Sequence, residues 1–288
     1  MKKIILYLII IFTPVAFFSC DKIDSPYLRN KGTTQTDTTS KSIHKKILLE
    51  DFTGHYCPNC PAAHEVAMEL KDQYGDSLII ISIHAGNLAT PSAGNYAYDF
   101  RTATGNQLNT DFAVPYNPIG MINRKISGGN ILVDYNNWPS VVGAMINDTA
   151  IVSLKITNTY NSSTKQLDVK VESNFLAIND VNYKLCVYLT EDSIVAYQKY
   201  ANPATGHVED VPDYVHRHVL RDAINSTYGD LISEEALEAN KTYTANLAAY
   251  TLKPEWVAKH CSVVAFIYNV DTKEVIQAEE APVIQSRK

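Results

Sequence analysis

The hydrophobic residues of the chain follow two different patterns, one before and one after residue 150. In the earlier part, residues 46–52 form a short apolar run and residues 78–83 a continuous one, as in the strands of a buried sheet. Between them, apolar positions from 61 to 74 recur with the spacing of one helical face. This order predicts a βαβ unit with two parallel strands and a right-handed crossover.

The α/β pattern continues less regularly up to residue 149. Weak helical spacing from residue 96 to 112 predicts an inserted helical segment over the sheet, and residues 119–123 predict a further strand. Residues 138–146 predict a closing helix. We therefore expect an α/β domain over residues 45–149.

From residue 150 onwards, short runs alternate between apolar and polar residues. The alternation is clear around residues 152–156, 167–171 and 183–189, with turn-forming residues between the runs. Period-two runs of this kind predict antiparallel strands in a β-sandwich, here over residues 150–288. Residues 201–229 do not fit the pattern and are expected to form a long irregular excursion between strands.

The N-terminus has the features of an export signal. Lys2 and Lys3 precede an apolar stretch that is too short, and too interrupted by Pro14, for a comfortable membrane span. The stretch ends in Ser19-Cys20, which resembles the lipobox of bacterial lipoproteins. The sequence thus predicts a signal peptide at 1–19, a lipid-modified Cys20 and a flexible polar tether over 20–44. An ordinary N-terminal membrane helix with an incidental Cys20 is the alternative.

Charge and cysteine content limit the partners and the chemistry. The net charge is −6, and no stripe of Lys and Arg suggests a nucleic-acid partner, so contact with the membrane is expected only through the N-terminal lipid. Of the five cysteines, Cys186 and Cys261 lie alone in apolar runs. A bridge between them and two buried free thiols are both compatible with the sequence.

The remaining two cysteines, Cys57 and Cys60, form a Cys-x-x-Cys motif between the first strand and the helix. At a helix N-terminus, free backbone N–H groups and the helix dipole stabilise a thiolate, and the spacing lets Cys60 close a small disulfide with Cys57. The motif predicts redox chemistry without a cofactor. A static disulfide is the alternative; a metal site that adds His64 is less favoured because a second cysteine pair is absent.

The segment around the motif resembles thioredoxin. Asp51 lies six residues before Cys57, where thioredoxins carry a buried aspartate that relays the proton of the second cysteine. Asn117-Pro118, directly before a strand, matches their cis-proline loop, for which Pro115 is a competing candidate. The inner residues 58–59 differ from those of thioredoxin, so no redox potential can be carried over. The resemblance implies four catalytic residues: Cys57, Cys60, Asp51 and Pro118.

The chain more closely resembles the Bacteroidetes outer-membrane lipoproteins named for a twenty-eight-kilodalton member. Segments 50–54, 57–61, 118–124 and 216–221 carry this resemblance, which covers nearly all of the mature chain. It implies a thioredoxin-like domain followed by an Ig-like sandwich, in a periplasmic or surface-facing protein of the outer membrane.

Two functions follow from these resemblances, and whether the chain is an enzyme is left open. One is thiol–disulfide exchange on exported proteins that carry thiols or disulfides. The other is a non-catalytic binding protein or adhesin for a surface ligand, in which the Cys57–Cys60 disulfide is structural.

Overall fold

Strands β1 (Ile47–Thr53) and β2 (Leu78–His84) are buried along their whole length and pair in parallel, Ile47 opposite Leu78 and Thr53 opposite His84. Helix α1 (Cys60–Tyr74) connects them, so the predicted βαβ unit is confirmed. The computed structural model describes residues 43–179 and 181–284, which fall within one compact unit. The expected signal peptide, Cys20 and most of the expected tether lie outside the described residues.

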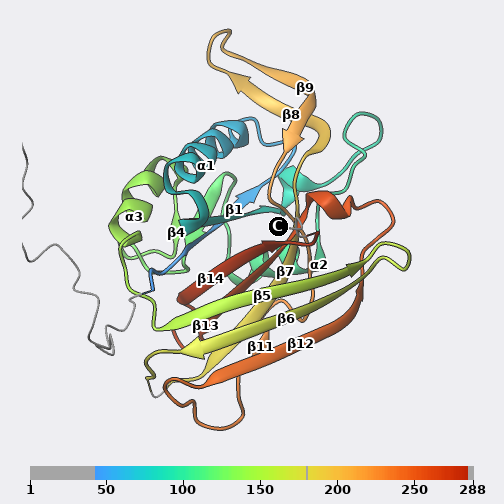
Figure 1. Cartoon of the computed structure of the whole chain (residues 1–288). Helices are drawn as coiled ribbons and strands as arrows, with labels where there is room; N and C mark the ends of the chain where they lie inside the picture. The colour runs from blue at the N-terminus through green and yellow to red at the C-terminus, as the bar shows by residue number, and fades with distance from the viewer. Residues whose placement is uncertain (1–42, 180, 285–288) are drawn as a thin grey trace, which may run out of the picture. The chain divides into compact units, whose positions relative to one another are not determined.

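The central sheet contains nine strands in the order β14-β13-β7-β10-β2-β1-β3-β4, with β11 paired to β7 (Figure 1). Its other strands are β3 (Ile119–Ile122), β4 (Leu132–Val133), β7 (Tyr183–Glu191), β10 (Val219–Ala223), β11 (Asp230–Leu231), β13 (Cys261–Asn269) and β14 (Val275–Pro282). Strand β10 pairs in parallel with β2 and antiparallel with β7. Strands from both sides of residue 150 therefore belong to one sheet, which the local pattern does not reveal because it does not identify a strand's neighbour.

Alternation along β1 directs its side chains to two different apolar layers. Ile47 and Leu49 pack towards α1 and α3 (Trp138–Met145), whereas Leu48 and Phe52 pack on the opposite face, near α2 (Ala103–Asp111). Since successive side chains of a strand point to opposite faces, Asp51 belongs to the α1 side and Glu50 to the other. The predicted helical segment and closing helix are confirmed as α2 and α3. Within residues 43–179 and 181–284, the other helical elements are four short 3₁₀ helices: Gly75–Ser77, Asn87–Ala89, Tyr135–Asn137 and Ala258–His260.

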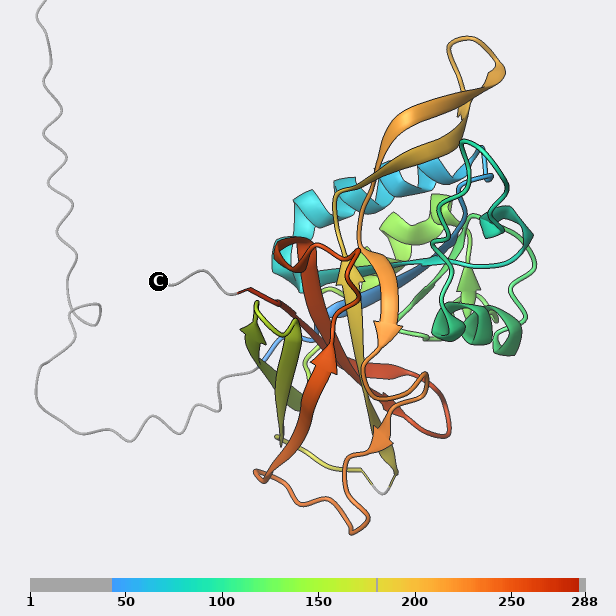
Figure 2. The same cartoon turned by 90° about the vertical axis from the view of Figure 1, so that its right-hand side faces the viewer.

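A second sheet, in the order β12-β6-β5, faces the β7, β13 and β14 end of the central sheet (Figure 2). It consists of β5 (Val152–Asn161), β6 (Gln166–Phe175) and β12 (Thr242–Thr251), all antiparallel. Residues of both sheets, among them Val171 and Val263, share one apolar cluster. The chain is thus a mixed α/β protein with mostly strands, and its second half forms the predicted antiparallel layers.

The expected irregular excursion at residues 201–229 is wrong. Strands β8 (Ile194–Asn202) and β9 (His207–His216) form a two-stranded antiparallel hairpin, here called the arm, and β10 follows it directly. The arm projects beyond the sheets near the start of α1 (Figures 1 and 2). Most of its residues are partly or fully exposed, so it lacks the apolar–polar alternation of a strand that buries one face.

Cys186 and Cys261 are both buried free thiols. Cys186 lies opposite Phe266 in the β7–β13 pair, whereas Cys261 lies opposite Glu191. Five positions along a strand amount to about 17 Å, which is far beyond the reach of a disulfide. The open choice between a bridge and two free thiols is therefore resolved in favour of free thiols. Separately, none of the helices in the described ranges has the length and apolar character needed to cross a membrane.

Candidate functional site

The loop that follows β1 holds the Cys57–Cys60 disulfide directly at the start of α1, with the two Cα atoms 5.4 Å apart. The Cys57 N–H donates to the carbonyl of Gly54 at 3.0 Å, which forms the turn into the helix. A Cβ atom on Gly54 would lie 2.4 Å from the Leu88 carbonyl oxygen, so a glycine is needed for this close approach. The predicted pairing of the two cysteines is confirmed.

The Asn117–Pro118 peptide bond is cis, and Pro115 is not cis. The Asn117 side-chain amide donates to the carbonyl of Thr53 at 3.0 Å and to that of Ala85 at 3.2 Å. The loop is thereby fixed at the carboxyl ends of β1 and β2, where the cysteine loop also begins. The choice of Pro118 over Pro115 as the cis-proline is confirmed; its catalytic role stays a prediction.

Asp51 is fully buried beneath α1, and neither oxygen of its carboxyl group has a hydrogen-bond partner among the described residues. Its Oδ2 atom lies 3.4 Å from Nε2 of His64. Loss of hydration raises the pKa of Asp51 from 3.8 to about 8, so the carboxyl group is mainly protonated at neutral pH. Cys60 lies one helical turn before His64 on α1, so the helix face that carries Cys60 covers Asp51.

His64 connects Asp51 to the arm. Its Nε2 atom lies 2.9 Å from the Thr53 hydroxyl, and its Nδ1 atom 2.6 Å from the Tyr214 hydroxyl of β9. Burial, and then the nearby charge of His218, lower the pKa of His64 to about 4, so the ring is neutral at physiological pH. Tyr214 was not predicted from the sequence, because it lies 150 positions from His64 and shares no local pattern with it.

The arm covers the cysteine loop. The Lys199 N–H donates to the His55 carbonyl at 2.8 Å, and the Ala201 N–H donates to the Pro58 carbonyl at 2.7 Å. The Gln198 side-chain amide donates to the carbonyls of Cys57 (2.9 Å) and Gly54 (3.3 Å). As a result, Cys57 is 1% exposed and Cys60 is 0% exposed, so the disulfide is closed off from solvent.

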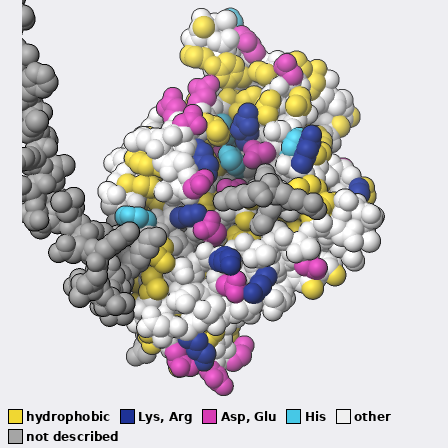
Figure 3. Space-filling model, viewed as in Figure 1, with side chains coloured by type: hydrophobic (Ala, Val, Ile, Leu, Met, Phe, Trp, Pro, Cys, Tyr) yellow, Lys and Arg dark blue, Asp and Glu magenta, His cyan; other side chains and the backbone are white. Residues whose placement is uncertain are grey.

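The arm carries exposed apolar side chains. Val195 and Val208 are 62% and 57% exposed, and Figure 3 shows hydrophobic side chains gathered over this part of the surface. Residues of β8 and β9 pair only with each other within the described sheets. The arm is therefore held by hydrogen bonds from Gln198, Lys199 and Ala201 of β8 to the cysteine loop rather than by a broad apolar core.

Beside the disulfide loop, Phe100 lies between two buried histidines, at ring distances of 4.5 Å from His84 and 4.4 Å from His216. Burial holds the pKa of His84 well below its usual value and lowers that of His216 to about 3. Both rings are thus neutral and act as packing groups. In the sequence His216-Arg217-His218, the first ring is buried whereas Arg217 is exposed.

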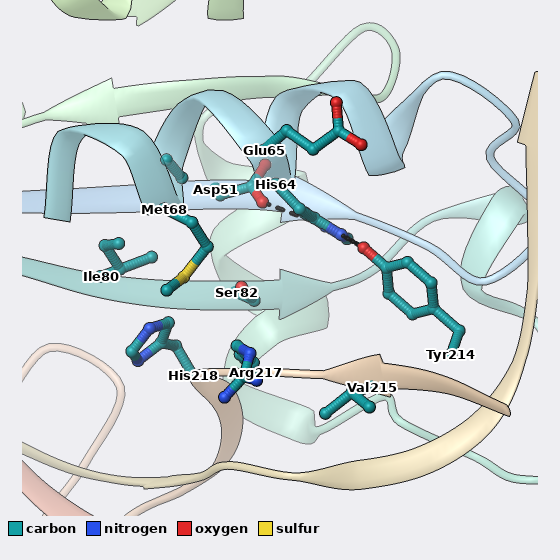
Figure 4. Close-up of a pocket in the computed structure, with 11 residues that line it drawn as sticks. Asp51, His64, Glu65, Met68, Ile80, Ser82, Tyr214, Val215, Arg217 and His218 are labelled. Carbon is teal, nitrogen blue, oxygen red and sulfur yellow. Dashed lines mark hydrogen bonds and ion pairs between the residues drawn. The ribbon is translucent and has the colours of Figure 1, made fainter. Parts of the chain in front are cut away.

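A cavity of about 270 Å³ opens beside Asp51, between α1, β2 and the base of β9 (Figure 4). Apolar groups of Met68, Ile80 and Val215 form much of its wall. The polar residues of the lining are Asp51, His64, Glu65, Ser82, Tyr214, Arg217 and His218. The sequence predicts Asp51 as a site residue but gives no sign of this cavity, because its walls come from distant segments.

Comparisons with known proteins complete the description. A family profile described as outer membrane protein Omp28 matches residues 105–287. HBP35 of Porphyromonas gingivalis has a similar structure (TM-score 0.61, 18% identity), covering 84% of this chain and 76% of that chain. A protein of Agrobacterium tumefaciens gives a TM-score of 0.50 at 13% identity, covering 85% of this chain and 98% of that chain. Both support the mixed α/β fold alone.

A domain of the outer membrane lipoprotein Omp28 from Porphyromonas gingivalis is 25% identical, with a TM-score of 0.30, and covers 48% of this chain and 92% of that chain. The comparison with curated proteins gives no match.

Proposed function

Since the chain belongs to the Omp28 family of outer membrane proteins and is therefore a cell-envelope protein, we propose that its Cys57–Cys60 pair performs thiol–disulfide exchange on exported proteins. The observation that carries the proposal is the disulfide at the start of α1, on the helix face that covers the buried Asp51. A lipid on Cys20 would hold the protein at the outer membrane, facing the periplasm or the surface.

A thioredoxin-like arrangement around the pair is part of this proposal. Strand β1 is parallel to β2 and antiparallel to β3, with the cysteines between β1 and α1 and the cis-proline before β3. This order agrees with a thioredoxin-like unit. The facing antiparallel layers after residue 150 agree in the same way with an Ig-like sandwich.

The exchange step follows from the chemistry of the pair. In the reduced protein, the Cys57 thiolate attacks a partner disulfide, and one partner sulfur leaves as a thiolate. In molecules whose Asp51 is ionised, Cys60 then gives its proton to the Asp51 carboxylate and attacks Cys57, which releases the second partner sulfur as a thiolate and forms the Cys57–Cys60 bond. The pKa of Asp51, about 8, lies near the value of about 8.5 of a free thiol, so the proton can move in either direction with little cost.

A second candidate is a binding protein in which the disulfide only fixes the loop. The observation that favours it is the burial of both cysteines beneath the arm. Exchange with a protein substrate requires the arm to move away from the loop, whereas a structural disulfide does not. The two functions therefore predict different effects of opening the arm: only in an exchange protein should it increase electron transfer to a protein substrate.

Gln198→Ala should accelerate reduction of the Cys57–Cys60 bond by dithiothreitol about tenfold or more. The change removes the side-chain bonds to Gly54 and Cys57, and losing about 1.4 kcal/mol of buried hydrogen bonding raises the open population tenfold. Alkylation of Cys57, followed by mass spectrometry of its peptide, measures the rate. Asn202→Ala, which removes a contact within the arm to Glu209, is the matched control and should leave the rate unchanged.

Insulin reduction by the same proteins then decides between the two functions. For an exchange protein, turnover should rise from wild type to Gln198→Ala and vanish in Cys57→Ser. If Gln198→Ala is reduced quickly by dithiothreitol yet transfers no more electrons to insulin than Cys57→Ser, the exchange function is wrong. That result would support the second candidate, a binding protein whose disulfide is structural.

A further inference from the structure

We infer that the cavity beside Asp51 is a binding site for a small molecule with an apolar body and a neutral hydrogen-bonding head, such as a primary amide or an alcohol. The site goes beyond the exchange function, because its occupant would bind whether or not the cysteines turn over. Three features support the inference: the largely apolar walls, the buried polar groups of the lining that lack hydrogen-bond partners, and the origin of the walls in separate elements.

The walls suit an apolar body of modest size. Ala67 and Met68 of α1, Ile80 of β2 and Val215 of β9 line the cavity, whose volume is about 270 Å³ (Figure 4). An apolar cavity of about 150 Å³ in another protein is known to take up benzene, and drug-sized ligands occupy about 300–1,000 Å³. A molecule of roughly eight to twelve non-hydrogen atoms fits between these limits.

The buried polar groups of the lining offer hydrogen bonds that nothing in the described part of the chain uses. The Asp51 side chain is 1% exposed, and neither of its oxygens has a hydrogen-bond partner, although Oδ2 lies 3.4 Å from Nε2 of His64. The ring nitrogens of His218, which also lines the cavity, are buried without a hydrogen-bond partner as well, although Nδ1 lies 3.7 Å from Oδ2 of Asp192. Buried polar groups are nearly always paired, so a ligand head that both donates and accepts would satisfy groups that are otherwise left without partners.

The charge state of these groups selects the head. Burial keeps Asp51 mainly protonated and holds the pKa of His218 below its usual value, although the nearby Asp192 carboxylate opposes the second effect. The two charged residues of the lining, Glu65 and Arg217, are both exposed to solvent. A carboxylate or an ammonium group next to the buried Asp51 would therefore lose its hydration there without meeting a full opposite charge. An amide or hydroxyl group loses much less, and it can both donate to and accept from the neutral carboxyl and imidazole groups.

Methionine methyl NMR on the full chain tests the site, because Met68 lines the cavity whereas Met121 and Met145 lie in the apolar cores. Hexanamide should shift the Met68 methyl signal in a saturable way and leave the signals of Met121 and Met145 in place. Hexanoate and hexylammonium should bind at least tenfold more weakly. The readout involves no redox step, so a failure of the exchange function leaves it unaffected.

Variants separate a defined site from general apolar binding. Asp51→Leu keeps the approximate shape but removes the hydrogen bonds, and should weaken hexanamide at least tenfold. Val215→Trp, which fills the cavity from the arm, should abolish the Met68 shift. Glu69→Gln, on an exposed position of the same helix, should bind as the wild type does. The inference is overturned if none of the three probes shifts Met68, if all three bind equally, or if Asp51→Leu retains full affinity.

Discussion

Asp51→Asn should stabilise the protein increasingly as the pH rises, by about 2.5 kcal/mol more at pH 7 than at pH 5. The pKa of the buried carboxyl is about 8 in the folded protein and 3.8 in the unfolded chain. Between these values, the folded protein holds a proton that the unfolded chain has released. The wild type therefore loses about 1.4 kcal/mol of stability per pH unit in this range, and the uncharged asparagine does not.

The loss of stability with rising pH that Asp51 causes is opposite to the pH dependence of a carboxylate in an ion pair, which stabilises a protein more as the pH rises. The contribution of Asp51 to stability is fully present below pH 3.8 and is lost as the pH rises towards 8. His64 and His216 act the other way, since their lowered pKa values make stability rise with pH up to about 6.5. Both histidines are present in wild type and variant, so their contribution cancels in the difference.

Urea unfolding of both proteins at pH 5, 6 and 7 measures the effect. The difference between their free energies of unfolding should widen steadily over this range. Asp72→Asn, at an exposed position on α1, is the control for the loss of one carboxyl group from the same helix region. If the curves for Asp51→Asn and wild type run parallel, the folded carboxyl is ionised at pH 5, and its role as a near-neutral proton carrier for Cys60 is lost.

The parts of the site that the sequence predicts are those that depend on local pattern. Strand, turn and helix around Cys57 follow from adjacent apolar runs, and period two places Asp51 and Glu50 on opposite faces of β1. The structure agrees, because Asp51 lies towards His64 on α1 whereas Glu50 pairs with Arg124.

The parts that the sequence does not predict depend on contacts between distant segments. The arm bonds to a loop about 140 residues earlier, through Gln198 and Cys57. Its own exposed valines give no alternation from which strands could be expected. Strand β10 joins β2 through the pairing of Val219 with Ser82, which depends on tertiary packing rather than on any property of residues 219–223 alone. The covered state of the disulfide and the cavity beside Asp51 both result from such contacts.

The second large change in stability is expected from substitutions in the ion pair on the other face of β1. Arg124 donates to both carboxylate oxygens of Glu50, at 2.6 and 2.7 Å, and both side chains are fully buried. The guanidinium group also lies over the rings of Phe266 (5.0 Å) and Phe112 (5.3 Å). Removing one partner leaves the other as an uncompensated buried charge, so Arg124→Met should cost about 3–5 kcal/mol of stability.

The double variant Glu50→Leu/Arg124→Met should recover most of this loss. An apolar pair removes the stranded charge and replaces the ion pair with contacts to the surrounding aromatic rings, and such exchanges are often neutral or stabilising by about 1–4 kcal/mol. Urea unfolding of the two single variants and the double variant forms a double-mutant cycle, in which the coupling energy should exceed about 2 kcal/mol. If the stability losses of the two single variants simply add up in the double variant, Glu50 and Arg124 do not interact as a buried ion pair. Because the pair lies on the face of β1 opposite Asp51, reduction of Cys57–Cys60 in the double variant should proceed at the wild-type rate.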